Sequence, residues 1–164
     1  MAFTDPRVTL KTMVDAWMAL NTPVIDDNVT PATFISLWES GPERMKYLFF
    51  DAGTDYDFIM TFGNPETRST RPIQDIPVHY QMVYPITVTT TDKYTAGVLV
   101  STGVYLQYKV TWEIRDAIEF QAQSVPAAVP AYTARVTTER TIHKRVGGID
   151  IWETTHRVEY ELGE

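Results

Sequence analysis

The sequence predicts one α+β domain in which two helices pack on a largely antiparallel sheet. Residues 4–23 and 104–123 repeat apolar side chains at helical spacing, and several β-branched and aromatic segments lie between them. A further pair of strand-like segments surrounds the Gly147-Gly148 pair and predicts a closing C-terminal β-hairpin. The 164 residues have the size of one domain, and no change in composition divides them, so we expect a single domain over residues 1–164.

The first predicted element is a helix within residues 4–23, "TDPRVTLKTMVDAWMALNTP". Asp5 is a suitable N-cap, and Pro6 falls in the first turn, where its missing N–H costs nothing. Asn21 and Pro23 end the helix. One face is apolar and is expected to pack on the sheet; it consists of Leu10, Met13, Val14, Trp17 and Met18.

Strands are predicted in residues 33–40, 44–50 and 56–63, although Pro31 could instead open a short helix in place of the first of them. A polar loop is expected over residues 64–72, "NPETRSTRP".

Residues 76–93 have the composition of one long strand. Because Pro77 and Pro85 cannot donate hydrogen bonds, we expect this strand at an edge, bulged, or broken at Pro85. Residues 94–103 fit neither a strand nor a helix pattern clearly.

The second helix is predicted over residues 104–123, where Leu106, Val110, Ile114 and Ile118 recur every four residues. Lys109 and Glu113, and then Arg115 and Glu119, are spaced as ion pairs along it. The helix is expected to end before the Pro- and Ala-rich residues 124–131.

Two registers are possible for the closing hairpin. A two-residue Gly147-Gly148 turn pairs Ile142 with Glu153, whereas a three-residue loop pairs Ile142 with Trp152, Val136 with Val158, Ala134 with Tyr160 and Lys144 with Asp150. The three-residue loop separates apolar from charged faces, so we prefer it. His143 and His156 then point to opposite faces; in the other register they share a face but lie roughly 13 Å apart. Neither arrangement brings both to one metal ion.

Composition restricts the partners. The net charge of −7 disfavours broad binding to nucleic acid or to an anionic membrane, and we expect no membrane partner and no sequence-specific nucleic-acid partner. The chain has no cysteine, hence no disulfide, thiolate zinc site or cysteine nucleophile. Charged residues interrupt the N-terminal segment, so no signal peptide is expected and the chain is interpreted as cytoplasmic or as part of an assembly built there.

No motif of nucleophilic catalysis or phosphate binding occurs, and we expect no cofactor. Asp51, Asp55 and Asp57 form the best acidic group; a solvated loop is the favoured interpretation, with a calcium or magnesium site as the alternative. A small hydrolase or isomerase would need Asp55 or Asp57 within hydrogen-bonding reach of His79.

Arg68 and Arg71 in the predicted polar loop could bind phosphate or an acidic partner surface, or could simply be solvated. The four tryptophans are expected in the core. A binding module is a further hypothesis, with a pocket between helix and sheet lined by Tyr105, Trp112 and Trp152.

Four stretches together resemble one family: "TDPRVTLKTMVDAWMALNTP", "VHYQMVYPITVTTTDK", "QYKVTWEIRDAIE" and "ERTIHKRVGGIDIWETTHRVEYEL". Their order and texture are similar to the tail-completion proteins of tailed viruses and proviruses, namely tail terminators and head–tail joining proteins. The resemblance implies a structural virion protein without catalytic residues. It would form a homo-oligomeric ring, commonly of six, at the end of the tail tube and dock to the neck. Arg68 and Arg71 are the expected contact with a partner.

Overall fold

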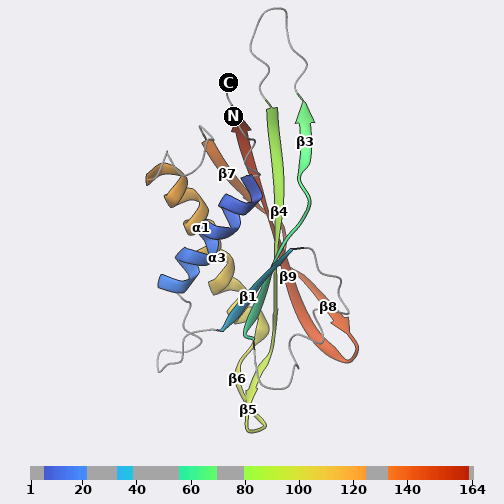
Figure 1. Cartoon of the computed structure of the whole chain (residues 1–164). Helices are drawn as coiled ribbons and strands as arrows, with labels where there is room; N and C mark the ends of the chain where they lie inside the picture. Colours follow the sequence, from blue (N-terminus) through green and yellow to red (C-terminus); the bar gives the residue numbers. More distant parts are fainter. Residues whose placement is uncertain (1–5, 22–32, 39–55, 70–79, 125–132, 163–164) are drawn as a thin grey trace, which may run out of the picture.

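The computed structural model describes residues 6–21, 33–38, 56–69, 80–124 and 133–162 (Figure 1). The two helices of the described residues are α1 (Pro6–Leu20) and α3 (Gly103–Ser124). The strands are β1 (Phe34–Trp38), β2 (Phe58–Phe62), β3 (Glu66–Ser69), β4 (Tyr80–Thr91), β5 (Lys93–Thr95), β6 (Val98–Ser101), β7 (Thr133–Thr138), β8 (Ile142–Val146) and β9 (Ile149–Leu162).

The main sheet runs in the order β1-β2-β4-β9-β7, with β3 also paired to β4 and β8 also paired to β9. Only the β1–β2 pair among its described strands is parallel. Strands β5 and β6 form a separate two-stranded sheet that projects from the lower end of the body in Figure 1. Both helices lie on one face of the main sheet (Figure 1), which confirms the predicted α+β class and the closing C-terminal hairpin.

The long strand β4 is continuous and central, so the expectation of an edge or a break at Pro85 is wrong. Pro85 has Arg157 of β9 as its register partner, and its carbonyl oxygen accepts a 2.9 Å hydrogen bond from the N–H of Gly63. The N–H and C=O of one strand residue point to the same side. The missing donor of Pro85 therefore faces the β2–β3 connection, and the ladder with β9 loses nothing.

The predicted loop over residues 64–72 is wrong in part, because Glu66–Ser69 forms β3 along the edge of β4. β2 and β3 share that edge: β2 pairs with residues 86–90 and β3 with residues 80–83. The chain passes from one to the other at Gly63, where an added Cβ would lie 2.8 Å from Cγ of Pro85.

The predicted hairpin register is correct for β7 and wrong for β8. Val136 faces Val158 as expected, but Ile142 faces Glu153 rather than Trp152. Gly147 and Gly148 both have positive φ (57° and 86°), as a tight two-residue turn requires. The register shifts by one residue between β7 and β8, where the N–H of Glu139 donates to the carbonyl of Thr155.

The core lies between the helices and the sheet. Leu10, Val14 and Met18 of α1 and Leu106, Val110, Ile114 and Ile118 of α3 pack against Phe58, Met60, Tyr84, Ile86, Val88, Val136 and Val158. The apolar stripes predicted for both helices are thus the buried faces. The opposite face of the sheet carries a smaller cluster around Ile59 and Ile151.

The first residue of helix α3, Gly103, is fixed by two hydrogen bonds and by close packing. The N–H of Gly103 donates to Oδ1 of Asp92, and its carbonyl accepts from Oγ1 of Thr90, each at 2.7 Å. A Cβ at Gly103 would lie 2.4 Å from Cε3 of Trp152 and 2.8 Å from the carbonyl carbon of Thr91. The glycine is needed for this close approach of helix and sheet.

His156 is a fully buried titratable group on the helix-facing side of β9. Its Nδ1 lies 3.0 Å from Oγ1 of Thr138, while the buried Nε2 makes no hydrogen bond within the described part of the chain. Burial, and then the positive charge of Arg115, lower the pKa of His156 from 6.5 to about 4, with a smaller opposing effect of Thr111. The imidazole is therefore neutral at pH 7.

We predict that Gly103→Ala destabilises the protein by roughly 1–3 kcal/mol, although alanine favours helices, because the methyl group meets the Trp152 ring. Chemical denaturation measures the loss. In a double-mutant cycle, Trp152→Leu should recover part of it. Additive effects of the two substitutions would contradict the steric explanation.

We predict that the free energy of unfolding falls by roughly 3 kcal/mol on account of His156 as the pH drops from 6.5 to about 4. The unfolded chain binds the proton first, because its histidine has the higher pKa. Denaturation curves of wild type and His156→Asn across this range measure the difference, since asparagine can keep the Thr138 contact but does not titrate. Parallel curves for the two proteins would contradict the assignment.

Candidate interaction surface

Helix α3 is apolar on two faces. Opposite its buried face, Val104, Tyr105, Tyr108 and Trp112 fall within one arc of about 100° around the helix axis. All four are exposed, with 73% of Tyr108 and 56% of Trp112 accessible to solvent. An ordinary surface helix carries polar residues on its outer face, so a second apolar face indicates a contact surface.

The β5–β6 hairpin adds further exposed apolar side chains. Tyr94 on β5 and the consecutive Val98, Leu99 and Val100 on β6 are all exposed, Val98 to 67%. Because successive strand residues point to opposite faces, both faces of β6 are apolar and open to solvent. The turn uses Ala96 and Gly97 at positive φ (50° and 79°), which suits a tight hairpin.

The hairpin leads directly into α3, because only Thr102 separates β6 from α3. We call the combined surface the α3–hairpin surface. It consists of Tyr94, Val98, Leu99, Val100, Val104, Tyr105, Tyr108 and Trp112. Residues 94–108 contain no Asp, Glu, Lys or Arg, although the whole chain has a net charge of −7.

Basic side chains border this surface and pack on its rings. Nζ of Lys109 lies 4.6 Å from the ring centroid of Tyr105, and the guanidinium carbon of Arg115 lies 5.9 Å from that of Trp112. Arg115 also pairs with Glu119 at 3.3 Å. These cation–π contacts restrain the two aromatic rings, which remain about half exposed.

Buried polar contacts fix α3, and thus the surface, on the sheet. Nε2 of the buried Gln107 donates to the carbonyl of Val88 at 2.9 Å. Nε1 of Trp17 donates to Glu113 at 3.3 Å and links α1 to α3. The α3 part of the surface is therefore presented on a rigid element.

Asp57 and Lys93 hold the base of the hairpin. Asp57 is buried, and its carboxylate accepts from the N–H of Thr33 and from Nζ of Lys93, the first residue of β5. The expectation of a solvated acidic loop is thus wrong for Asp57, whose two oxygens are engaged by protein donors. Asp51 and Asp55 lie outside the described residues.

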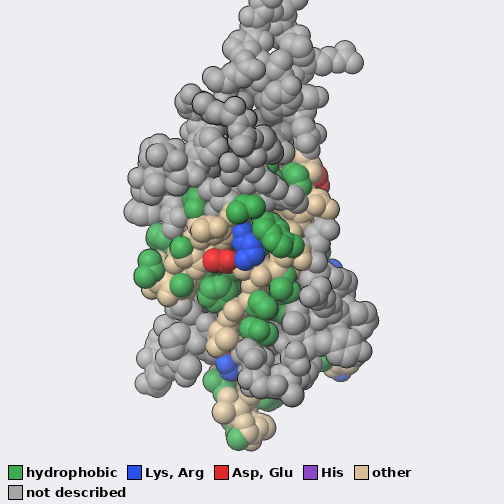
Figure 2. Space-filling model, viewed as in Figure 1, with side chains coloured by type: hydrophobic (Ala, Val, Ile, Leu, Met, Phe, Trp, Pro, Cys, Tyr) green, Lys and Arg blue, Asp and Glu red, His purple; other side chains and the backbone are tan. Residues whose placement is uncertain are grey.

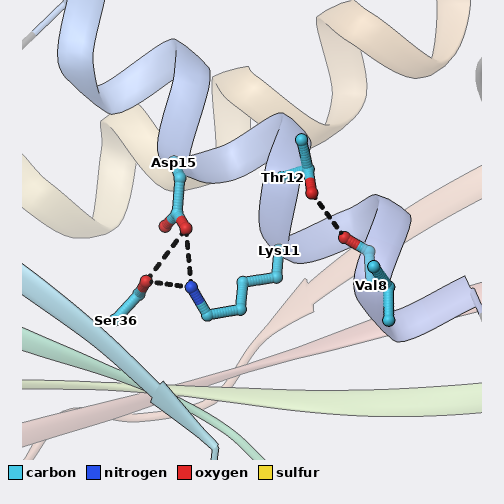
Figure 3. A network of polar contacts seen from close by, with 5 residues as sticks. All are labelled: Val8, Lys11, Thr12, Asp15 and Ser36. Carbon is cyan, nitrogen blue, oxygen red and sulfur yellow. Dashed lines mark hydrogen bonds and ion pairs between the residues drawn. The ribbon is translucent and has the colours of Figure 1, made fainter.

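A second polar network joins α1 to β1. Nζ of Lys11 lies 2.7 Å from Oδ2 of Asp15 and 2.5 Å from Oγ of Ser36, and Ser36 donates to the same carboxylate at 3.0 Å (Figure 3). In Figure 2 an acidic and a basic side chain lie together near the centre of a described face that is otherwise mainly apolar or uncharged. The network fixes α1 on the parallel edge of the sheet.

The predicted partner residues are only partly placed. Arg68 lies in β3, opposite Gln81 of β4, and Arg71 and His79 lie outside the described residues.

His143 stacks on Trp152, with 5.1 Å between the ring centroids, and its Nε2 lies 3.0 Å from Oδ1 of Asp150. In the observed register His143 and His156 share a face, four residues apart along β9, and this spacing of roughly 13 Å separates them too far for one metal ion.

The predicted core role of the tryptophans holds only for Trp17. Trp17 packs against the core, whereas Trp152 is half-buried outside both core clusters, and Trp38 and Trp112 are exposed. The pocket lining predicted between helix and sheet is wrong for Tyr105 and Trp112, which face outward.

The α3–hairpin surface was not predicted from the sequence, because Tyr105 and Trp112 were placed between the helix and the sheet and not on an outer face. The signal was present: Val104, Tyr108 and Trp112 also recur every four residues, and residues 94–108 are uncharged.

No known family model matches the chain, and no significantly similar curated protein was found. Neither of the two described helices is both long and apolar enough to span a membrane.

We predict that Lys93→Met destabilises the protein by roughly 2–4 kcal/mol, because it leaves the buried Asp57 carboxylate without its cation. Lys11→Met is the matched control: it removes a similarly shielded lysine, but Asp15 is partly exposed, so we expect a loss of about 1 kcal/mol or less. Chemical denaturation of both variants measures the two losses. Equal losses would contradict the role assigned to the burial of Asp57.

Proposed function

We propose that the chain is a structural assembly subunit of a tailed virus or provirus, a tail terminator or head–tail joining protein. Its copies form a ring, commonly of six, that closes the end of the tail tube and docks to the neck. The subunit acts in the virion and is assembled in the host cytoplasm. Its function requires association rather than catalysis or a cofactor.

The α3–hairpin surface is the observation that carries this proposal. A helix with two apolar faces and a hairpin with two exposed apolar faces are unfavourable on a protein that stays alone in water. Both are explained when another protein surface covers them. The resemblance in element order, namely helix, strands, helix and closing strands, supports an assembly of the tail-completion kind.

Docking to the tube or neck would use other surfaces. Arg68 on β3 and Arg71 beyond it remain the proposed contact with an acidic partner surface, since arginine pairs with carboxylates in a planar, two-pronged geometry. The acidic charge of the chain would disfavour adhesion of DNA passing through the ring.

We predict that the purified protein self-associates into closed rings. Light scattering over a wide concentration range measures the mass, and negative-stain images of the same sample show whether particles are closed and how many subunits they hold. Six-subunit rings are the expected result. A monomer at every concentration, or open filaments, would contradict the proposal.

A further inference from the structure

We infer that the α3–hairpin surface is where two copies of this chain meet. This inference rests on the proposed function and names the partner of the surface. The exposed area of the surface, the marginal stability of the hairpin and the distribution of charge each support this inference.

The surface is large enough for a stable contact. Its eight large apolar side chains are each about half exposed. At roughly 100 Å² of exposed area for each, they offer on the order of 800 Å². A standard protein–protein contact buries about 800 Å² on each partner, so the exposed apolar area of α3 and of both hairpin faces together is comparable to one side of such a contact.

The hairpin needs a partner for its own stability. β5 has 3 residues and β6 has 4, they pair only with one another in the described part of the chain, and the register shifts between Lys93 and Tyr94. A two-stranded hairpin alone is marginally stable in water. The Asp57–Lys93 pair fixes its base, but the exposed Val98, Leu99 and Val100 contribute burial energy only when something packs on them.

The charge distribution favours a second copy as that partner. Each copy has a net charge of −7, and residues 94–108 contribute none of it. Repulsion between two like-charged chains is weakest where the contact surface itself carries no charge. A strongly charged partner would find no opposite charge within this stretch, only the lysine and arginine at its border.

The test compares Leu99→Glu and Tyr108→Glu with Leu20→Glu. Leu20, on α1, is 85% exposed but lies outside the surface. Mass is measured by light scattering and sedimentation, and thermal unfolding with circular dichroism checks that each variant is folded. We expect the two surface variants to raise the dissociation constant about 30-fold or more, and the Leu20 variant to change it less than about threefold.

Amide hydrogen exchange gives a second readout on the unaltered chain. We expect residues 94–108 to become protected as the protein concentration rises, while β4 and β9 exchange equally slowly at all concentrations.

The outcomes separate this inference from the proposed function. Rings that persist in folded Leu99→Glu and Tyr108→Glu, without protection of residues 94–108, would overturn the inference and leave the ring proposal standing. Closed dimers that both variants dissociate would support the inference and overturn the ring. A wild-type chain that is monomeric at every concentration would overturn both.

Discussion

The β4–β9 ladder is the constraint on which the rest of the structure depends. All 12 residues of β4 have a partner in β9, and each strand carries two short strands in succession on its outer edge. The changeovers, at Gly63 on one edge and Glu139 on the other, lie at nearly the same level of the ladder. Arg157 of β9 lies at the same level of the ladder and pairs with both Glu66 and Glu139, so one side chain connects the two changeovers. The hydrogen bonds to these two carboxylates raise the pKa of Arg157. The sheet is thus two half-sheets joined by one continuous ribbon.

This ribbon also determines how α3 sits. Asp92, directly after β4, accepts from the first N–H of α3, and Trp152 of β9 packs where a side chain at Gly103 would otherwise lie. With the start of the helix fixed, the four-residue repeat of Leu106, Val110, Ile114 and Ile118 turns toward the core. The same geometry necessarily turns Tyr105, Tyr108 and Trp112 outward. Once the buried face of α3 is packed on the sheet, helix geometry therefore fixes the direction of the outer apolar side chains.

Features that depend on local periodicity were predicted correctly from the sequence. Predictions failed for features that depend on contacts with another strand. Both helices, the strands around Phe34 and Phe58 and the α+β class follow from spacing of apolar residues. The place of Pro85 in a central strand could not be predicted, because it depends on Gly63 facing its missing donor. The hairpin register failed because segregation of apolar and charged faces was weighed above turn geometry, whereas the chain satisfies both by shifting register at Glu139. The burial of Asp57 could not be predicted, because its two hydrogen-bond donors, Lys93 and Thr33, are distant in sequence.

If the chain self-associates as proposed, its charge distribution would favour a defined assembly over aggregation. Since residues 94–108 are uncharged, the whole net charge of −7 resides on the remainder of the chain. Association through that remainder meets like-charge repulsion, while association through the α3–hairpin surface gains apolar burial. The same distribution makes the contact salt-tolerant, because apolar burial is not screened by ions, whereas the opposing repulsion is. Raising ionic strength should therefore strengthen self-association, the reverse of the behaviour of an interface held by ion pairs, and sedimentation at low and high salt distinguishes the two. Weaker association at high salt would show that charge pairs, not the apolar side chains of α3 and the hairpin, hold the copies together.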